Sequence, residues 1–452
     1  MSVQGATMSG HGGHKPRRLG IWMSTALVVG NMIGSGVFLL PASLAAYGGI
    51  SILGWLMTAA GALLLAFVFA RLGQTLPKIG GPYAYSREGF GDAIGFQVAW
   101  GYWIAIWAGN AAIVTAFVGY LGAFWPALAG NAALSIATGI AVIWLLTFVN
   151  ILGVRPSGMV QLLTTIGKLL PLLAVAAFGV FFFDAGKFVP FNQTGGSDFS
   201  AVTATAALTL WAFIGIESAT IPAEDVEDPT HTIPRSTIIG TIVATLVYVL
   251  GTVAVMSVIP SADLRVSTAP FADAATVMFG PLAGTLVAIG ALVSTFGCLN
   301  GWILLQGQLP LAAARDGLFP QAFARLSANG TPVFGLVISS VLVTLLMVLS
   351  YTPRLIDVFN FTLLLATMTT LVPYVFTACA QMVMVAREPG RHGGPRPLLT
   401  VAIAFLAFLY AMWTLYGAGA EVVLWGTLLI LAGLPVYAWL RWQSPARGKA
   451  GG

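Results

Sequence analysis

Charged residues are scarce in this chain of 452 residues: Asp, Glu, Lys and Arg together make up 8% of the sequence. Soluble domains carry about 25%, so an ordinary soluble protein is excluded. Hydrophobic residues account for 58% of the chain, and the mean hydropathy is +0.90. The shortage of charge therefore indicates a protein that crosses a lipid bilayer many times.

Cysteine and histidine are also rare, with two and four residues respectively. Cys298 and Cys379 both fall in apolar segments, which favours free, buried thiols over a disulfide framework. All four histidines lie in the N-terminal tail or in predicted cytoplasmic loops, so no histidine cluster at membrane depth can hold a metal. We therefore expect no metal and no cofactor.

Long hydrophobic runs dominate the rest of the chain. A helix needs about 20 apolar residues to cross the hydrocarbon core, and twelve segments meet this length. The predicted spans are 20–47, 51–75, 92–122, 131–152, 157–183, 200–222, 236–259, 280–307, 333–351, 357–386, 398–416 and 421–440. The first run is too long for a signal peptide, so we expect it to be retained. The Gly- and Ser-rich segment 1–18 is predicted to be a disordered cytoplasmic tail.

Lys and Arg are distributed unequally between the two sides. With the N-terminus inside, sixteen lie in predicted cytoplasmic segments and only Lys187, Arg265 and Arg354 lie outside. Basic residues accumulate on the cytoplasmic side of membrane proteins, so both termini, including the tail 443–452, are predicted to be cytoplasmic. The net charge of +5 then reflects topology, and it gives no case for nucleic acid as a partner.

The first span is interrupted by small and polar residues in the stretch VVGNMIGSGVFLLP, residues 28–41. Its two parts, 19–29 and 37–46, are predicted to be half-helices separated by Gly30, Asn31, Gly34, Ser35 and Gly36. Irregular backbone survives at membrane depth only where it lines a cavity or is buried in protein. The alternative is a surface of small residues for close helix packing.

A second interruption lies in the sixth span, in the stretch LWAFIGIESATIP, where Gly215, Glu217 and Ser218 break the apolar run before Pro222. The two interruptions are five helices apart, so two five-helix units in tandem enter the membrane with opposite orientations. Broken helices at matching positions of such inverted repeats indicate a substrate site near the midplane. Free amides at half-helix N-termini suit a carboxylate and unwound carbonyls suit an ammonium group.

The predicted fold is therefore an all-α integral membrane protein with twelve transmembrane helices. Residues 19–190 form the first repeat and residues 191–390 form the second, inverted repeat. Residues 391–442 supply helices 11 and 12. Helices 1 and 6 are predicted to be broken at the midplane.

Two charged residues cannot be placed in a loop, a tail or a helix end: Glu217 and Lys168. Such groups cost about 2.5 to 3.5 kcal/mol at mid-bilayer and are functional by default. Burial would favour the protonated form of Glu217, which suggests proton sensing; a structural hydrogen bond is the alternative. Lys168 lies about ten residues beyond the loop that holds Arg155, which is far for its ammonium to reach the surface.

Several motifs are similar to the amino acid, polyamine and organocation transporter superfamily, and most closely to its bacterial arginine/agmatine antiporters. They are GNMIGSGVFLLPASLA, GGPYAYSREGFG, LWAFIGIESA, GCLNGWILLQGQ, ARDGLFPQAFAR and TLVPYVFT, and the likeness covers residues 19 to 439. The resemblance implies a LeuT-like fold, a location in the bacterial inner membrane and a small amino acid or amine as substrate.

The resemblance also implies roles for individual residues. The amides of Ser35 and Gly36 would hold the substrate carboxylate. The α-ammonium group would bind the carbonyls of Met32, Trp211 and Ile214, and Asn31 would line the same site. The remaining implied roles are gating by Trp211, stacking on the substrate side chain by Trp302, closure by Tyr102, contact with a distal guanidinium or amine by Asn110, and a pH response by Glu217.

Two features depart from the arginine/agmatine pattern. Lys168 resembles the lysine of proton-linked amino acid transporters, where an ammonium replaces a bound sodium ion. Leu363 and Leu364 align with small hydroxyl residues of the family, which removes a polar partner for a guanidinium group. The function that the resemblance implies is a secondary amino acid transporter that works by alternating access, an antiporter of the arginine/agmatine type. The two departures support an alternative to it, a proton-coupled or exchange carrier of neutral amino acids that uses Lys168 in place of a sodium ion.

Two further classes are less well supported. An ion channel would need a pore lined by rings of carbonyls or charges, and an enzyme would need a nucleophile with its orienting base. The sequence supplies neither, and it leaves open the exact substrate and whether the chain forms a homodimer.

Overall fold

The computed structural model describes residues 20–77, 80–128, 130–152, 172–220, 226–350 and 354–443, and every regular element in them is a helix. The helices of ten or more residues are α1 (Ile21–Met32), α2 (Ser35–Leu44), α3 (Ser51–Thr75), α5 (Asp92–Leu121), α6 (Ala132–Ile151), α8 (Asp198–Leu210), α9 (Pro229–Val258), α11 (Pro270–Phe279), α12 (Pro281–Arg315), α13 (Val333–Leu349), α14 (Leu355–Arg387), α15 (Pro397–Gly417), α16 (Ala420–Leu431) and α17 (Gly433–Gln443).

Ten helical segments of the described residues are long and apolar enough to cross a membrane. Two shorter apolar helices, Leu172–Phe182 and α13, fall in the fifth and ninth predicted spans. Each of the ten longer segments coincides with one predicted span. These lengths and the apolar composition confirm the expected all-helical membrane protein.

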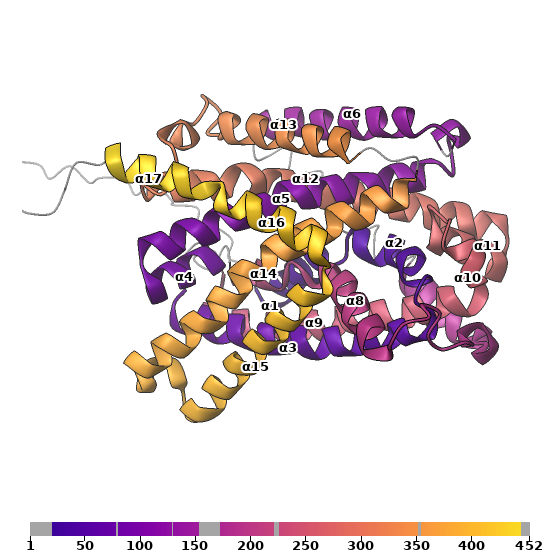
Figure 1. The fold of residues 1–452 in the computed structure, drawn as a ribbon, viewed down its shortest axis with the longest axis horizontal. Helices are drawn as coiled ribbons and strands as arrows, with labels where there is room; N and C mark the ends of the chain where they lie inside the picture. Colours follow the sequence, from indigo (N-terminus) through magenta and orange to yellow (C-terminus); the bar gives the residue numbers. More distant parts are fainter. Residues whose placement is uncertain are drawn as a thin grey trace, which may run out of the picture.

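The buried residues separate into two main hydrophobic clusters. One gathers around α1, α2, α3 and α9, and the other gathers around α5, α6, α12 and α13. In Figure 1, α6 and α13 lie side by side along one edge of the molecule, and α5 packs on both α12 and α14. Trp211 packs against both clusters, so its indole lies where they meet.

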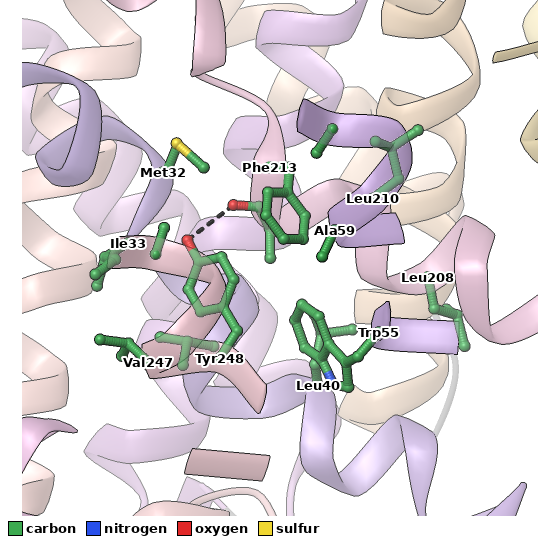
Figure 2. Packing of buried hydrophobic residues seen from close by; sticks show 14 of the residues in the cluster. Met32, Ile33, Leu40, Trp55, Ala59, Leu208, Leu210, Phe213, Val247 and Tyr248 are labelled. Carbon is green, nitrogen blue, oxygen red and sulfur yellow. Dashed lines mark hydrogen bonds between the residues drawn. The ribbon is translucent and has the colours of Figure 1, made fainter. Parts of the chain in front are cut away.

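Aromatic side chains fill the first cluster beside this boundary. Trp55, Phe213 and Tyr248 are fully buried and pack against one another in edge-to-face and tilted pairs, with ring centroids 5.3 to 6.1 Å apart. The hydroxyl of Tyr248 donates to the carbonyl of Ala212 at 2.8 Å, as Figure 2 shows. In an apolar environment an unpaired carbonyl is costly, so this bond stabilises an irregular part of the backbone.

The structure corrects three predicted boundaries. The first interruption is shorter than predicted, because α1 continues through Asn31 to Met32 and α2 already begins at Ser35. In a helix the backbone amides and carbonyls form hydrogen bonds with one another, so no polar group is left unpaired in the membrane. This explains why the small residues on both sides of the break remain helical. α12 runs on to Arg315, beyond the predicted end at residue 307, and the last predicted span divides into α16 and α17.

Candidate functional site

The first break consists of two residues between α1 and α2. Ile33 is extended, with φ −78° and ψ 92°, and Gly34 has φ −133° and ψ −135°. The amides of Ser35 and Gly36 therefore belong to the first turn of α2, where amides have no intrahelical partner. No side chain caps this end of α2, so its positive helix terminus suits an anionic group.

The second break follows α8. The chain forms a single 3-10 turn, Trp211–Phe213, becomes extended at Ile214 and continues into a second 3-10 segment, Ile216–Thr220. Gly215 has φ +113°, which L-residues rarely adopt, so this position requires glycine. Pro222, which is predicted to follow the interruption, lies outside the described residues.

The two breaks are in direct contact. A Cβ atom at Gly215 would lie 3.2 Å from the carbonyl carbon of Asn31. The side-chain amide of Asn31 donates to the hydroxyl of Ser218 at 2.9 Å. The interruptions that the sequence places 180 residues apart thus form one structural unit.

Two adjoining hollows lie beside this unit, and their cavity volumes are about 20 and 10 Å³. The first is lined by Asn31, Met32, Gly34, Ser35, Gly36, Ile113, Trp211, Ile214, Cys298 and Trp302. The second is lined by Tyr102, Ala105, Ile106, Gly109, Ile113, Trp211, Ile214, Trp302 and Thr370. None of these lining residues carries a charged side chain. One hollow therefore offers backbone groups of both breaks, and the other is mostly aromatic and aliphatic.

The indole of Trp211 lies against both α2 and α5. Its indole nitrogen donates to the hydroxyl of Ser35 at 3.4 Å. Cβ atoms at Gly36 and Gly109 would lie 3.0 and 2.7 Å from its ring, so a larger residue at either position would require the indole to shift. The side chain lines both hollows.

Glu217 is fully buried next to the second break. Its carboxylate accepts hydrogen bonds from the hydroxyl of Tyr102 on α5, from the hydroxyl of Tyr374 on α14 at 2.7 Å and from the amide of Gly215 at 3.2 Å. One side chain thus ties the irregular backbone to two long helices.

The structure places most of the predicted site residues together. Eight of the nine predicted substrate contacts line the hollows: Asn31, Met32, Ser35, Gly36, Tyr102, Trp211, Ile214 and Trp302. Asn110 is fully buried but does not belong to either lining, and its amide nitrogen donates to Gln306 at 2.8 Å. Leu363 is fully buried in the first cluster and Leu364 packs against both clusters. Lys168 lies outside the described residues.

Several lining residues were not predicted from the sequence. Ile106, Gly109 and Ile113 follow Tyr102 at intervals of three or four residues and so share one face of α5; this spacing could have identified them. Thr370 lies in the quoted TLVPYVFT motif, and Cys298 was expected only as a buried thiol. Neither cysteine forms a disulfide.

The described residues contain no group of three or more His, Cys, Asp and Glu side chains that could hold a metal ion. The described lining of the hollows therefore offers peptide groups, hydroxyls and aromatic faces. These groups can bind a small organic molecule.

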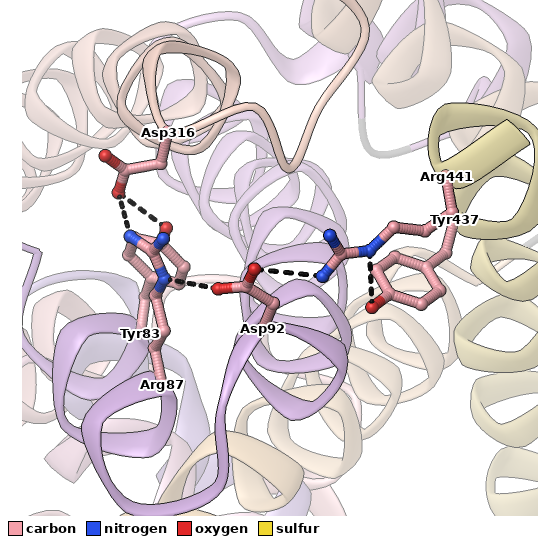
Figure 3. A network of polar contacts seen from close by, with 6 residues as sticks. All are labelled: Tyr83, Arg87, Asp92, Asp316, Tyr437 and Arg441. Carbon is pink, nitrogen blue, oxygen red and sulfur yellow. Dashed lines mark hydrogen bonds and ion pairs between the residues drawn. The ribbon is translucent and has the colours of Figure 1, made fainter. Parts of the chain in front are cut away.

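A second polar cluster lies where α4 (Pro82–Phe90) meets the ends of α5, α12 and α17 (Figure 3). Arg87 forms ion pairs with Asp92 at 2.9 Å and with Asp316 at 3.0 Å, and Arg441 pairs with Asp92 at 2.9 Å. Tyr83 donates to Asp316 at 2.7 Å. Burial and this hydrogen bond raise the pKa of Tyr83 far above its ordinary value, so the phenol remains a donor.

An all-helical membrane protein whose interrupted helices meet beside an uncharged hollow has the architecture of the membrane transporters. A model of the amino acid permease family matches residues 19–440. The chain therefore belongs to the amino acid permease family, within the amino acid, polyamine and organocation superfamily.

Curated relatives cover nearly the same length. The putrescine transporter PotE of Haemophilus influenzae is 32% identical over 431 residues, which cover 95% of this chain and 98% of the relative. The cadaverine/lysine antiporter of Escherichia coli strain K12 is 38% identical over 376 residues, 81% of this chain and 83% of the relative. PotE of the same strain is 31% identical over 440 residues, 97% and 99% of the two chains. The polyamine and amino acid antiporter type is thus supported.

Proposed function

We propose that this protein exchanges a basic amino acid for its decarboxylated amine by alternating access, as an antiporter of the arginine/agmatine type. The observation that carries this proposal is the contact between the two helix breaks beside the hollow that their backbone lines. Unpaired amides at the start of α2 suit a carboxylate, and carbonyls of the unwound segments suit an ammonium group. An α-amino acid carries both groups on one carbon.

Several of the lining residues have a proposed role. The amides of Ser35 and Gly36 hold the carboxylate, while the carbonyls of Met32, Trp211 and Ile214 accept from the α-ammonium group. Asn31 completes the polar wall. Tyr102 and Trp211 close over the substrate, because they border the two hollows from α5 and from the second break.

The side chain of the substrate would occupy the mostly aromatic hollow. A distal cation has no acidic partner in the lining, but the faces of Trp302 and Trp211 can attract it. The relatives named for putrescine and for cadaverine and lysine support a cationic substrate. Between arginine, lysine and their amines, we favour arginine and agmatine on the motifs quoted above.

For the membrane arrangement we propose twelve spans in the bacterial inner membrane with both termini cytoplasmic. The ten longer and two shorter apolar helices support this number. Residues 19–190 and 191–390 would form the inverted repeats, and the two breaks, five spans apart, would lie near the midplane. Lys168 and Glu217 would couple transport to protons, and a homodimer is one proposed assembly.

Exchange in proteoliposomes tests this proposal. Vesicles loaded with agmatine should take up labelled arginine, and empty vesicles should not, because an antiporter needs a substrate on both sides. Lysine with cadaverine, and ornithine with putrescine, should be tested in the same way. Uptake of a neutral amino acid into empty vesicles under a proton gradient alone would contradict exchange and support the neutral carrier that uses Lys168.

A further inference from the structure

A chain of hydrogen bonds crosses four helices behind the site. The side-chain nitrogen Nδ2 of Asn110 on α5 donates to the side-chain oxygen Oε1 of Gln306 on α12 at 2.8 Å. The amide nitrogen of Gln306 contacts the hydroxyl of Ser340 on α13 at 2.8 Å, and this hydroxyl lies 2.6 Å from that of Thr147 on α6. Thr147 in turn donates to the carbonyl of Ile143 at 2.7 Å. All four side chains are fully buried.

The direction of this chain follows from its backbone ends. The amide nitrogen of Gln306 also donates to the carbonyl of Leu336 at 3.3 Å. A carbonyl oxygen only accepts, so the nitrogen of Gln306 must lie on this side. Its oxygen must then face Asn110, which presents its own nitrogen in return. Neither amide can flip without placing two acceptors or two donors against each other.

In this orientation the side-chain nitrogen of Asn110 is bonded to Gln306, and the side-chain oxygen of Asn110 is its other polar atom. That oxygen is buried and has no hydrogen-bond partner among the described residues. Asn110 lies on α5 within one helical turn of Ile106 and Ile113, which line the mostly aromatic hollow. A buried acceptor without a partner is unfavourable, and a donor on the substrate would relieve this cost.

We infer that Gln306 is a positioning residue that fixes the amide of Asn110 with its oxygen available, so that the site selects substrates carrying a distal N–H donor. This inference rests on the proposed function, because it concerns the substrate side chain of the proposed site. An ammonium or guanidinium group supplies the donor, whereas an aliphatic side chain leaves the oxygen unpaired. Sites that bond a substrate N–H reject analogues that lack it more strongly than apolar pockets reject a missing methylene.

The test compares lysine with norleucine, which has the same carbon chain without the terminal amine. Binding of both to purified full-length protein is measured by calorimetry. Gln306→Met keeps the side-chain length and removes the acceptor that holds Asn110, so the preference for lysine should fall about tenfold. Gln308→Met is the matched control, because Gln308 lies two residues away on α12, outside this chain of hydrogen bonds and outside the lining of both hollows.

A double-variant cycle separates positioning from general packing. In an Asn110→Ala background, Gln306→Met should cause no further loss of preference, since Gln306 acts through Asn110. Ser340→Ala removes one of the two acceptors for the amide nitrogen of Gln306 and should cause an intermediate loss, and it serves if Gln306→Met does not fold.

The outcomes distinguish this inference from the proposed function. A wild-type protein that binds norleucine as tightly as lysine overturns both. A wild-type protein that prefers lysine, together with a Gln306→Met variant that prefers it equally, overturns the role of Gln306 alone.

Discussion

At the scale of single residues, the glycines of the first break are constrained by close neighbours. A Cβ atom at Gly34 would lie 2.5 Å from the sulfur of Cys298, and one at Gly36 would lie 3.0 Å from the ring of Trp211. Both distances are shorter than ordinary contact between side chains. Small residues here keep the backbone open to the hollow and leave Trp211 in place.

We expect Gly36→Leu to abolish arginine binding while the protein stays folded. Overpacking costs about 1 to 3 kcal/mol, which is less than the total stability of about 5 to 15 kcal/mol of a typical protein. The new side chain would displace Trp211 and cover the amides at the start of α2. Thermal shift with arginine measures the effect, since a ligand raises the stability of the form that binds it.

Gly390→Leu is the control for this experiment, because a Cβ atom there meets nothing within 4 Å. It should retain the arginine-induced shift of the wild-type protein. An equal shift in Gly36→Leu would contradict the proposal that the substrate touches the backbone at this position.

Whether a residue of the site can be identified from the sequence depends on how that residue contributes to the site. Asn31, Ser35 and Gly215 are visible because polar and small residues are rare in an apolar run. Gln306 is not visible as a partner of Asn110, because they are 196 residues apart and only the packing of α5 on α12 brings them together. Side-chain pairs of this kind require the tertiary structure.

At the scale of elements, the cluster around Arg87 joins α4 to the ends of α5 and α12. The side chains in the two ion pairs of Arg87 are 36 to 43% exposed, so each pair is worth at most about 1 kcal/mol. The cluster would have to separate if these helix ends moved apart. The cluster therefore contributes little to the free energy of unfolding, but it joins particular helix ends to one another.

We expect Arg87→Ala to lower the unfolding temperature slightly at low salt and to reduce its sensitivity to salt. Screening acts over about 10 Å at 0.1 M salt and about 3 Å at 1 M, so high salt already weakens the pairs in the wild-type protein. Thermal unfolding in detergent at both concentrations measures this. Arg325→Ala, at an exposed arginine, is the control; equal salt sensitivity of Arg87→Ala and wild type would contradict the prediction.

The ends of the helices depend on tertiary contacts as well as on the local sequence. Charge, proline and length identified the apolar segments, because these properties act locally. The actual ends depend on contacts: α1 keeps its helical form through Asn31, whose side chain bonds Ser218 in the other break. A run of glycine, asparagine and serine therefore indicates that a break exists and leaves its length to the packing.

At the scale of the whole molecule, the two hydrophobic clusters meet at the second break. Trp211 contacts both clusters, and Glu217 connects the break to α5 and α14 through Tyr102 and Tyr374. The helices that move in an alternating-access cycle would have to change these contacts. The small and polar residues that interrupt two apolar runs, and their spacing of five spans, predicted the two breaks and their pairing, but the two tyrosines that donate to Glu217 became evident only in the folded structure.

The protonation of Glu217 would act on this arrangement. As a carboxylate it accepts from two phenols and one backbone amide. A protonated carboxyl group donates from one oxygen, so one phenol must change from donor to acceptor, and the remaining bonds lose the added strength that a charged acceptor gives them. The break would then be held less firmly to α5 or α14, and exchange should become faster as the pH falls.

Glu217→Gln tests this because glutamine has nearly the same shape and carries no charge. Its amide nitrogen cannot accept, so the variant should resemble the protonated protein at every pH. We expect its exchange rate to change little between pH 5 and pH 8, and at pH 8 to exceed that of the wild type, whose rate should decline across this range. Labelled arginine exchange in proteoliposomes with equal pH on both sides measures these rates. A variant that keeps the pH profile of the wild type would show that Glu217 has only a structural role at the break, and that protonation of another group changes the exchange rate.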